Sequence, residues 1–289
     1  HTSLPLTIPN FLNQYPSVTL EDIYKSKTGG GWTRLCIKAG QYNDTVDKNS
    51  EKAIFSAIWN RVLQCTSYSY LVFLLNLFRS KGKWNNLDIV ANQWALMAHY
   101  DFWHKPSINL GYKSLEESLV FLTSDELLNE EVMAVIEAVI DTIDTEEIPM
   151  KISIPSSLMV HARYSRDAVL AAFGVHTIDK KSSSREGVLE IKKLNIELLF
   201  VTLQKTEKRF SPTTLYHDYA ISETLFHWQS QNSARPDKGK GLSYINHKAE
   251  GKTLLLFVRE QSQDEYGRAM GFVNLGAVSL VSYHGSQPM

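Results

Sequence analysis

The sequence predicts an α+β protein with a helical N-terminal half followed by a β-rich C-terminal half. Apolar residues recur at helical spacing through the first half,. After the polar stretch 180–184 the apolar runs become short and rich in Ile, Val, Leu and Phe, which is typical of strands,. A junction with two prolines, Pro149 and Pro155, separates the two patterns. We therefore expect a helical domain over residues 1–150 and a β-rich domain over residues 151–289.

In the first half, four apolar stripes predict helices. They are Ile54, Phe55, Ile58 and Val62; Leu71–Phe78; Ile89, Trp94, Met97 and Tyr100; and Val132, Val135, Ile136, Val139 and Ile143. Ser50 is expected to cap the first helix, because its hydroxyl can accept a free backbone N–H there. Ser114 and Glu117 fit a capping box at the start of another helix. Past the junction, Ser165 is expected to cap a short helix that runs through Phe173 and is stopped by Gly174.

In the second half, the apolar runs 196–203, 254–258 and 271–275 predict strands, and 278–283 has the partial alternation of another,. The segment Arg235–Gly241 has the composition of an exposed loop,. Strands joined by polar turns, without long helices between them, favour a compact β-barrel or sandwich.

Composition excludes several classes of protein. The longest apolar runs are far shorter than the ~20 residues of a membrane-spanning helix, and two cysteines, Cys36 and Cys65, indicate reduced thiols in a cytoplasmic protein,. Neither the cysteines nor the histidines have metal-ligand spacing, so we expect no metal and no cofactor. Residues 1–154 carry a net charge of −5 and residues 155–289 a net charge of +4, which makes the second half the better neighbour of a polyanion,. The chain begins at His1 without an initiator Met, so we expect part of the protein to lie upstream.

From His161 onward, uncommon strings follow one another in a fixed order. They are HARYSRD (161–167), REGV (185–188), LLFVTLQKTEKRFSPTTLYHDYAIS (198–222), LFHWQSQ (225–231), YINH (244–247), LLLFVRE (254–260) and YHGSQPM (283–289). These strings resemble the C-terminal domain of bacterial proteins that combine a phospholipase-D-like nuclease with a DEAD/DEAH-type helicase, such as the SauUSI-like type IV restriction enzymes. The resemblance covers roughly the last 130 residues; the first half fits only by position, as the helical region after the helicase.

The resemblance implies a function. In such enzymes the nuclease and the helicase lie upstream, and the C-terminal portion recognises DNA with a modified cytosine. It also implies a barrel of the SRA or PUA-like kind, in which an extruded 5-methylcytosine lies between aromatic rings. The helical half would then couple the sensor to the motor. The chain has neither the His-x-Lys pattern of such a nuclease nor a phosphate loop, so we expect no catalytic activity of its own,.

A pocket for an extruded base needs aromatic faces and a hydrogen-bond acceptor for the exocyclic amine of cytosine. Tyr216, Asp218 and Tyr219 supply these groups within four residues, and Trp228 is the next candidate ring. The alternative is that the aromatic rings pack in the core and that Asp218 caps a turn.

Basic and polar residues of the second half are candidates for contacts to DNA phosphates or base edges. They are His161, Arg163, Arg166, Lys205, Lys208, Arg209, His227, Gln229, Gln231, Arg235, Lys238 and Lys240. Ion pairs within the protein, or simple solvation, would explain the same charges. Two other functions therefore remain open: a scaffold that docks the nuclease or helicase parts, and a B3-like reader of unmodified sequence.

Overall fold

The computed structural model describes residues 6–25, 30–204 and 218–285, which fall into two compact units. The first unit consists of His1–Glu147, Pro155–Leu158 and Ala162–Ser182; the second consists of Ile148–Ile154, Met159–His161 and Ser183–Met289. This division differs from a single boundary at residue 150. Residues 162–182 belong with the helices because their helix, α9 (Arg166–Ala172), packs against α6 (Ile89–Trp103).

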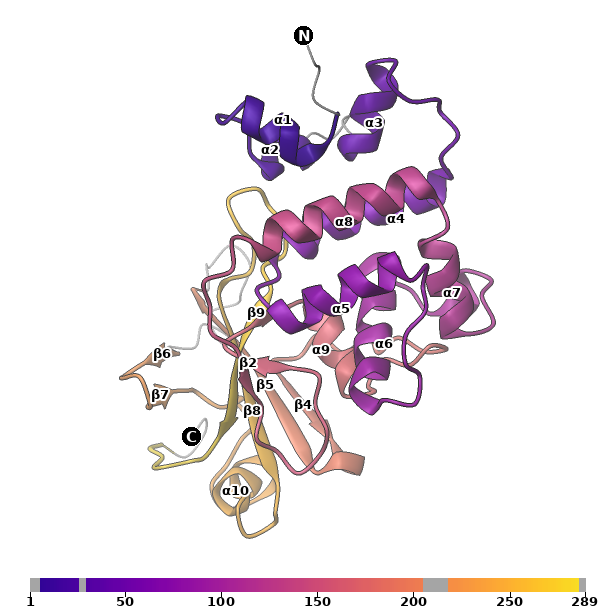
Figure 1. The fold of residues 1–289 in the computed structure, drawn as a ribbon. Helices are drawn as coiled ribbons and strands as arrows, with labels where there is room; N and C mark the ends of the chain where they lie inside the picture. Colours follow the sequence, from indigo (N-terminus) through magenta and orange to yellow (C-terminus); the bar gives the residue numbers. More distant parts are fainter. Residues whose placement is uncertain (1–5, 26–29, 205–217, 286–289) are drawn as a thin grey trace. The chain divides into compact units, whose positions relative to one another are not determined.

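The first unit is helical, as predicted. Besides α6 and α9, its elements are α1 (Ile8–Gln14), α2 (Leu20–Tyr24), α3 (Gly31–Lys38), α4 (Lys48–Asn60), α5 (Tyr68–Arg79), α7 (Leu115–Leu122), α8 (Glu126–Ile140), the two-residue strand β3 (Arg163–Tyr164), and 3-10 turns at Val62–Gln64 and Ser107–Asn109. Helices α4 and α8 lie side by side (Figure 1). The four predicted stripes locate helices α4, α5, α6 and α8,. Two stripe residues lie outside them: Val62 is in the 3-10 turn after α4, and Ile143 lies beyond the end of α8.

The helix caps agree with the sequence only in part. The predicted cap of α4 is wrong: Asp47, not Ser50, is the N-cap, and its Oδ1 accepts the backbone N–H of Ser50 at 2.8 Å. Ser114 caps α7 by accepting the N–H of Glu117 at 3.1 Å, but the Glu117 carboxylate accepts the N–H of Lys113 and does not close the box. Ser165 caps α9 as predicted.

A buried carboxylate organises the start of the first unit. Glu131 of α8 accepts the backbone N–H groups of Trp32 and Thr33 at 2.8 and 2.9 Å, and the hydroxyl of Tyr24. These N–H groups belong to the first turn of α3 and have no partner within the helix. Burial raises the pKa of Glu131,. One side chain thus joins α2 and α3 to α8.

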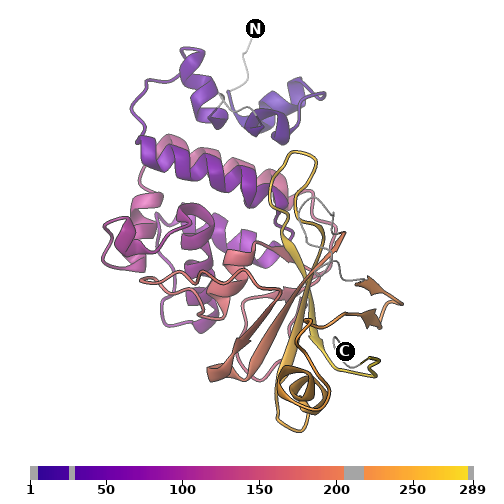
Figure 2. The ribbon, with the colours of Figure 1, turned by 180° about the vertical axis from the view of Figure 1, so that it is seen from behind.

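The second unit contains β1 (Ile148–Pro149), β2 (Met159–Val160), β4 (Val188–Ile191), a 3-10 turn (Lys192–Leu194), β5 (Ile196–Gln204), β6 (Tyr219–Ala220), β7 (Phe226–His227), α10 (Gly239–Asn246), β8 (Thr253–Gln261) and β9 (Phe272–Val278). Its main sheet has the order β9-β8-β5-β4. The central pair β5–β8 is parallel, and the flanking pairs are antiparallel. The short ribbon β6–β7 lies apart from this sheet (Figure 2).

This arrangement confirms the α+β class, whereas the pairings do not show a closed barrel. Two details of the sequence prediction are wrong. No strand covers residues 278–283, because β9 ends at Val278 and the chain beyond it is irregular. The predicted loop Arg235–Gly241 ends early, because α10 begins at Gly239.

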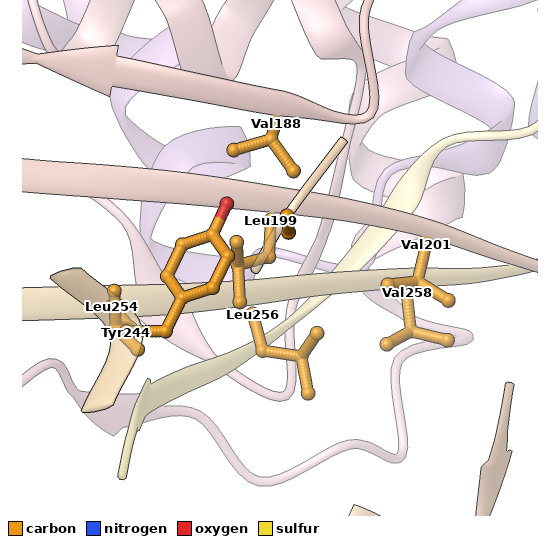
Figure 3. Packing of buried hydrophobic residues seen from close by; sticks show 8 residues of the cluster. Val188, Leu199, Val201, Tyr244, Leu254, Leu256 and Val258 are labelled. Atoms are coloured by element: carbon orange, nitrogen blue, oxygen red, sulfur yellow. The ribbon is translucent and has the colours of Figure 1, made fainter. Parts of the chain in front are cut away.

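The central strands are buried on both faces, which explains their unbroken apolar sequences. On one face lies the cluster Val188, Leu199, Val201, Ala234, Tyr244, Leu254, Leu256 and Val258, most of which Figure 3 labels. On the other face the Phe200 ring stacks on that of Phe257 at 5.4 Å between centroids. Among the residues that the structure describes, no helix is both long enough and apolar enough to cross a bilayer.

Candidate nucleic-acid interface

The ribbon β6–β7 presents two of the predicted recognition residues. Tyr219 and His227 are direct cross-strand partners, and their ring centroids lie 4.9 Å apart. Both side chains are exposed, with Tyr219 at 52%. A turn closes the ribbon, in which the N–H of Ile221 donates to the carbonyl of Leu225 at 2.8 Å. The ribbon therefore holds an aromatic pair at the surface.

The base of the ribbon is fastened by Asp218. This residue is 6% exposed, and its Oδ1 accepts the backbone N–H of Gln229 at 2.8 Å. The contact joins the residue before β6 to the chain that follows β7. This contact corresponds to the alternative in which Asp218 stabilises a turn instead of recognising a base. It holds the two ends of the ribbon together.

Trp228 lies between the ribbon and the core. Its ring meets that of Tyr244 edge to face at 5.3 Å, and the side chain packs against the apolar cluster of Figure 3,. Trp228 as a whole residue is half-buried. His227 is exposed, whereas Phe226, Gln229 and Gln231 are half-buried and Ser230 is buried, so exposure does not alternate along the segment.

The other predicted contact residues are dispersed. Tyr216, Lys205, Lys208 and Arg209 lie outside the described residues. His161 is an exposed residue of the second unit with a left-handed φ of 73°. Arg163 and Arg166 are half-buried residues of the first unit. Gln231 is half-buried, and its carbonyl accepts the N–H of Ala234.

Two of the predicted phosphate-binding cations are engaged within the protein. Arg235 forms a two-point ion pair with Asp237 at 3.0 and 3.2 Å, which raises the pKa of Arg235. The Nζ of Lys240 lies 2.6 Å from Glu197 Oε1 and 3.3 Å from Glu190 Oε2. Lys238, by contrast, is exposed at the start of α10.

Lys240 belongs to an ionic cluster that we did not predict. Glu197 is fully buried in β5 and faces Glu190 across the β4–β5 pair. Lys252, with 8% of its side chain exposed, lies 2.8 Å from Glu190 and 3.6 Å from Glu197. The hydrogen bond from Lys252, with the charge of Lys240, lowers the pKa of Glu190,. The one signal for this cluster in the sequence is a carboxylate inside the apolar run 196–203.

The ionic cluster fixes α10, and through it Trp228. Lys240 and Tyr244 both extend from α10 toward Glu197, with the Tyr244 hydroxyl 3.5 Å from its Oε1. At Gly241 the helix approaches the chain after β7 so closely that a Cβ atom would lie 2.2 Å from the carbonyl oxygen of Arg235. Tyr244 then presents its ring to Trp228, so the cluster and the ribbon form one connected structure.

In the described ranges no set of three His, Cys, Asp or Glu side chains is placed to bind a metal ion. Residues 158–288 match the model of a family described as a domain of unknown function (DUF3427). No curated protein and no solved structure matches the chain.

Proposed function

We propose that this chain is the DNA-recognition portion of a larger restriction protein and recognises 5-methyl- or 5-hydroxymethylcytosine by base flipping, without catalysis of its own. The observation that carries the proposal is the exposed Tyr219–His227 pair on a fastened ribbon, within the strings that resemble type IV restriction enzymes. We place the protein in the cytoplasm with the helicase and nuclease parts upstream of it, and two buried free thiols, Cys36 and Cys65, support that compartment,.

The chemistry fits the geometry of the ribbon. Extruding a base costs a few kcal/mol, and stacking on an aromatic ring returns about 1–3 kcal/mol per base. Tyr219 supplies an exposed ring, and the half-buried Trp228 is a second candidate. A methyl group in a fitted apolar site adds only ~1 kcal/mol, so we expect a modest preference for the modified base. We also propose an SRA/PUA-like fold for the second unit; this part of the proposal rests on the resemblance, because the described pairings form an open mixed sheet.

One observation favours a second function, the docking of another protein. The turn of the ribbon exposes Ile221 at 54% and Leu225 at 39%, beside the exposed Glu223. Apolar side chains with a carboxylate suit a protein surface better than the phosphates of DNA.

Fluorescence anisotropy of labelled duplexes tests both functions. Modified duplexes should bind better than matched unmodified ones at the same salt concentration. Tyr219→Ala should reduce this preference. Tyr266→Ala, which removes a similarly exposed side chain (46% against 52%) from the same unit, should not. Equal binding of both duplexes, with no effect of Tyr219→Ala, would reject modified-base recognition. Absence of any binding would favour the docking platform.

Asp218 requires two variants because it has a structural contact. Asp218→Asn retains an oxygen that can accept the Gln229 N–H, whereas Asp218→Ala does not,. If Asp218 only fastens the ribbon, the Asn variant should keep the preference for modified DNA and the Ala variant should lose it. If the carboxylate itself reads the base, both variants should lose it while folding normally.

A further inference from the structure

Two turns of the second unit lie together at one edge of its main sheet. The 3-10 turn Lys192–Leu194 leads into β5, and the segment His247–Lys252 leads from α10 into β8. Because β5 and β8 are parallel, with Ile196 opposite Thr253, their starts share one edge (Figure 2). Hydrogen bonds join the two turns directly.

These hydrogen bonds involve Asn195, which follows the 3-10 turn. Its carbonyl accepts the N–H of Thr253 at 3.0 Å, and its side-chain Nδ2 donates to the carbonyl of Glu250 at 2.9 Å. Asn195 has a left-handed φ of 52°, a conformation that asparagine tolerates better than most residues,. The positions of the two turns relative to each other are therefore determined by the backbone.

The second turn is further held by His247, which is 4% exposed. Its Nδ1 lies 3.2 Å from the carbonyl of Lys252, and its Nε2 accepts the N–H of Leu280 at 3.3 Å. Both contacts are made by a neutral imidazole that carries its proton on Nδ1. The turn is thus anchored to α10 and to the chain after β9.

The surface of these turns is basic. Lys192, Lys193 and Lys248 are exposed, and Glu250 is the acidic residue beside them. Beneath them, Lys252 and Lys240 are paired with Glu190 and Glu197 and add no net charge. We name Lys192, Lys193 and Lys248 the lysine edge.

We propose that the lysine edge binds the phosphate backbone of the nucleic acid that the second unit recognises, an inference that rests on the proposed function. Ammonium groups on backbone-fixed turns can neutralise phosphates without reading sequence. The edge also supplies contacts that the sequence had assigned to Arg235 and Lys240, both of which are paired internally.

The test is the salt dependence of DNA binding by the triple variant Lys192→Gln, Lys193→Gln, Lys248→Gln. Each phosphate contact contributes about 0.9 to the slope of log K against log salt concentration. We expect the slope to become shallower by about 2–3, with equal loss of affinity for modified and unmodified duplexes. The matched control, Lys52→Gln, Lys83→Gln, Lys113→Gln, removes the same charge from exposed lysines of the first unit and should leave the slope within about 1 of the wild type,.

The outcomes separate the two proposals. An unchanged slope in a variant that still discriminates modified DNA would overturn the lysine edge alone. A shallower slope in a protein that never discriminates would support the edge and overturn modified-base recognition. Equal effects of the test and control variants would show a general charge effect and overturn the edge. Replacement of the same three residues by arginine should restore the slope, because arginine returns the three positive charges.

Discussion

The buried ionic cluster gives the sharpest test of how the second unit is built. Glu197 is fully buried. Its carboxylate oxygens lie 2.6 Å from Lys240 Nζ and 3.6 Å from Lys252 Nζ. Glu197→Gln preserves the shape of the side chain and removes its charge. Lys252, with only 8% of its side chain exposed, then keeps Glu190 as its ion-pair partner and the Ser243 hydroxyl as a hydrogen-bond acceptor.

The size of the effect follows from burial. Breaking a buried ion pair costs about 3–5 kcal/mol because a desolvated charge is left behind. Lys240 has 39% of its side chain exposed, so water can solvate its charge when Glu197 is neutralised,. Glu190 still forms an ion pair with Lys252. We therefore expect a loss of about 2–3 kcal/mol in the free energy of unfolding. With a urea dependence of about 2 kcal/mol per molar, the midpoint should fall by about 1–1.5 M.

Fluorine NMR of protein labelled with 5-fluorotryptophan provides the assay, because Trp228 is the only tryptophan in the second unit. Its resonance, assigned with Trp228→Phe, should disappear at lower urea in Glu197→Gln. It should also shift in the folded state, since Tyr244 contacts both Glu197 and Trp228. Glu265→Gln, at an exposed site of the same unit, should change stability by less than about 0.5 kcal/mol,. A midpoint equal to that of the control, with an unshifted resonance, would refute the idea that the cluster holds α10 in place.

Three further predictions follow from particular contacts. Gly241→Ala should destabilise the second unit by about 1–3 kcal/mol in urea unfolding, because the new Cβ would lie 2.2 Å from the backbone oxygen of Arg235; a variant as stable as the wild type would contradict this packing,. Glu131→Ala should lower the free energy of unfolding of the first unit by at least ~2 kcal/mol, since it leaves the buried N–H groups of Trp32 and Thr33 without acceptors, while Glu130→Ala at the exposed neighbouring position should change it little; equal losses would reject the capping role,. Lys252 and Lys240 lower the pKa of Glu190 in the folded state, so its contribution to stability is complete above the unfolded pKa near 4.5 and is lost as pH falls through the folded pKa,. Glu190→Gln should therefore flatten the acid side of the plot of unfolding free energy against pH for the second unit. An unchanged plot would show that Glu190 does not contribute.

The helical unit was the more predictable part of the chain. Its stripes of Ile, Leu and Val repeat at 3.6 residues, and a helix must bury such a face. Cap identity was less certain, because Asp47 and Ser50 lie one turn apart and both residue types can cap,. The side chain of Glu131 gave no local signal, since its partners lie about one hundred residues away in the chain.

In the second unit the sequence located the three long strands but not what lies between them. The apolar runs at 196–203, 254–258 and 271–275 became β5, β8 and β9. Two glycines and short polar stretches concealed α10, because a helix packed closely on a neighbouring chain requires Gly241 where propensity disfavours it,. The residue types of a candidate base pocket could be selected from the sequence, but the exposure of those residues could not.

The sequence alone determined the α+β class, the four main helices of the first unit and the three long strands of the second, because periodicity is a local property of the chain,. Only the tertiary structure decided which charges are available. It paired Lys240 with the buried Glu197, fastened Asp218 to Gln229, and exposed Lys192, Lys193 and Lys248 at one edge of the sheet. The strength of the interaction between two charges depends on their distance and on whether water surrounds them. Both depend on which strands, far apart in the sequence, meet in space.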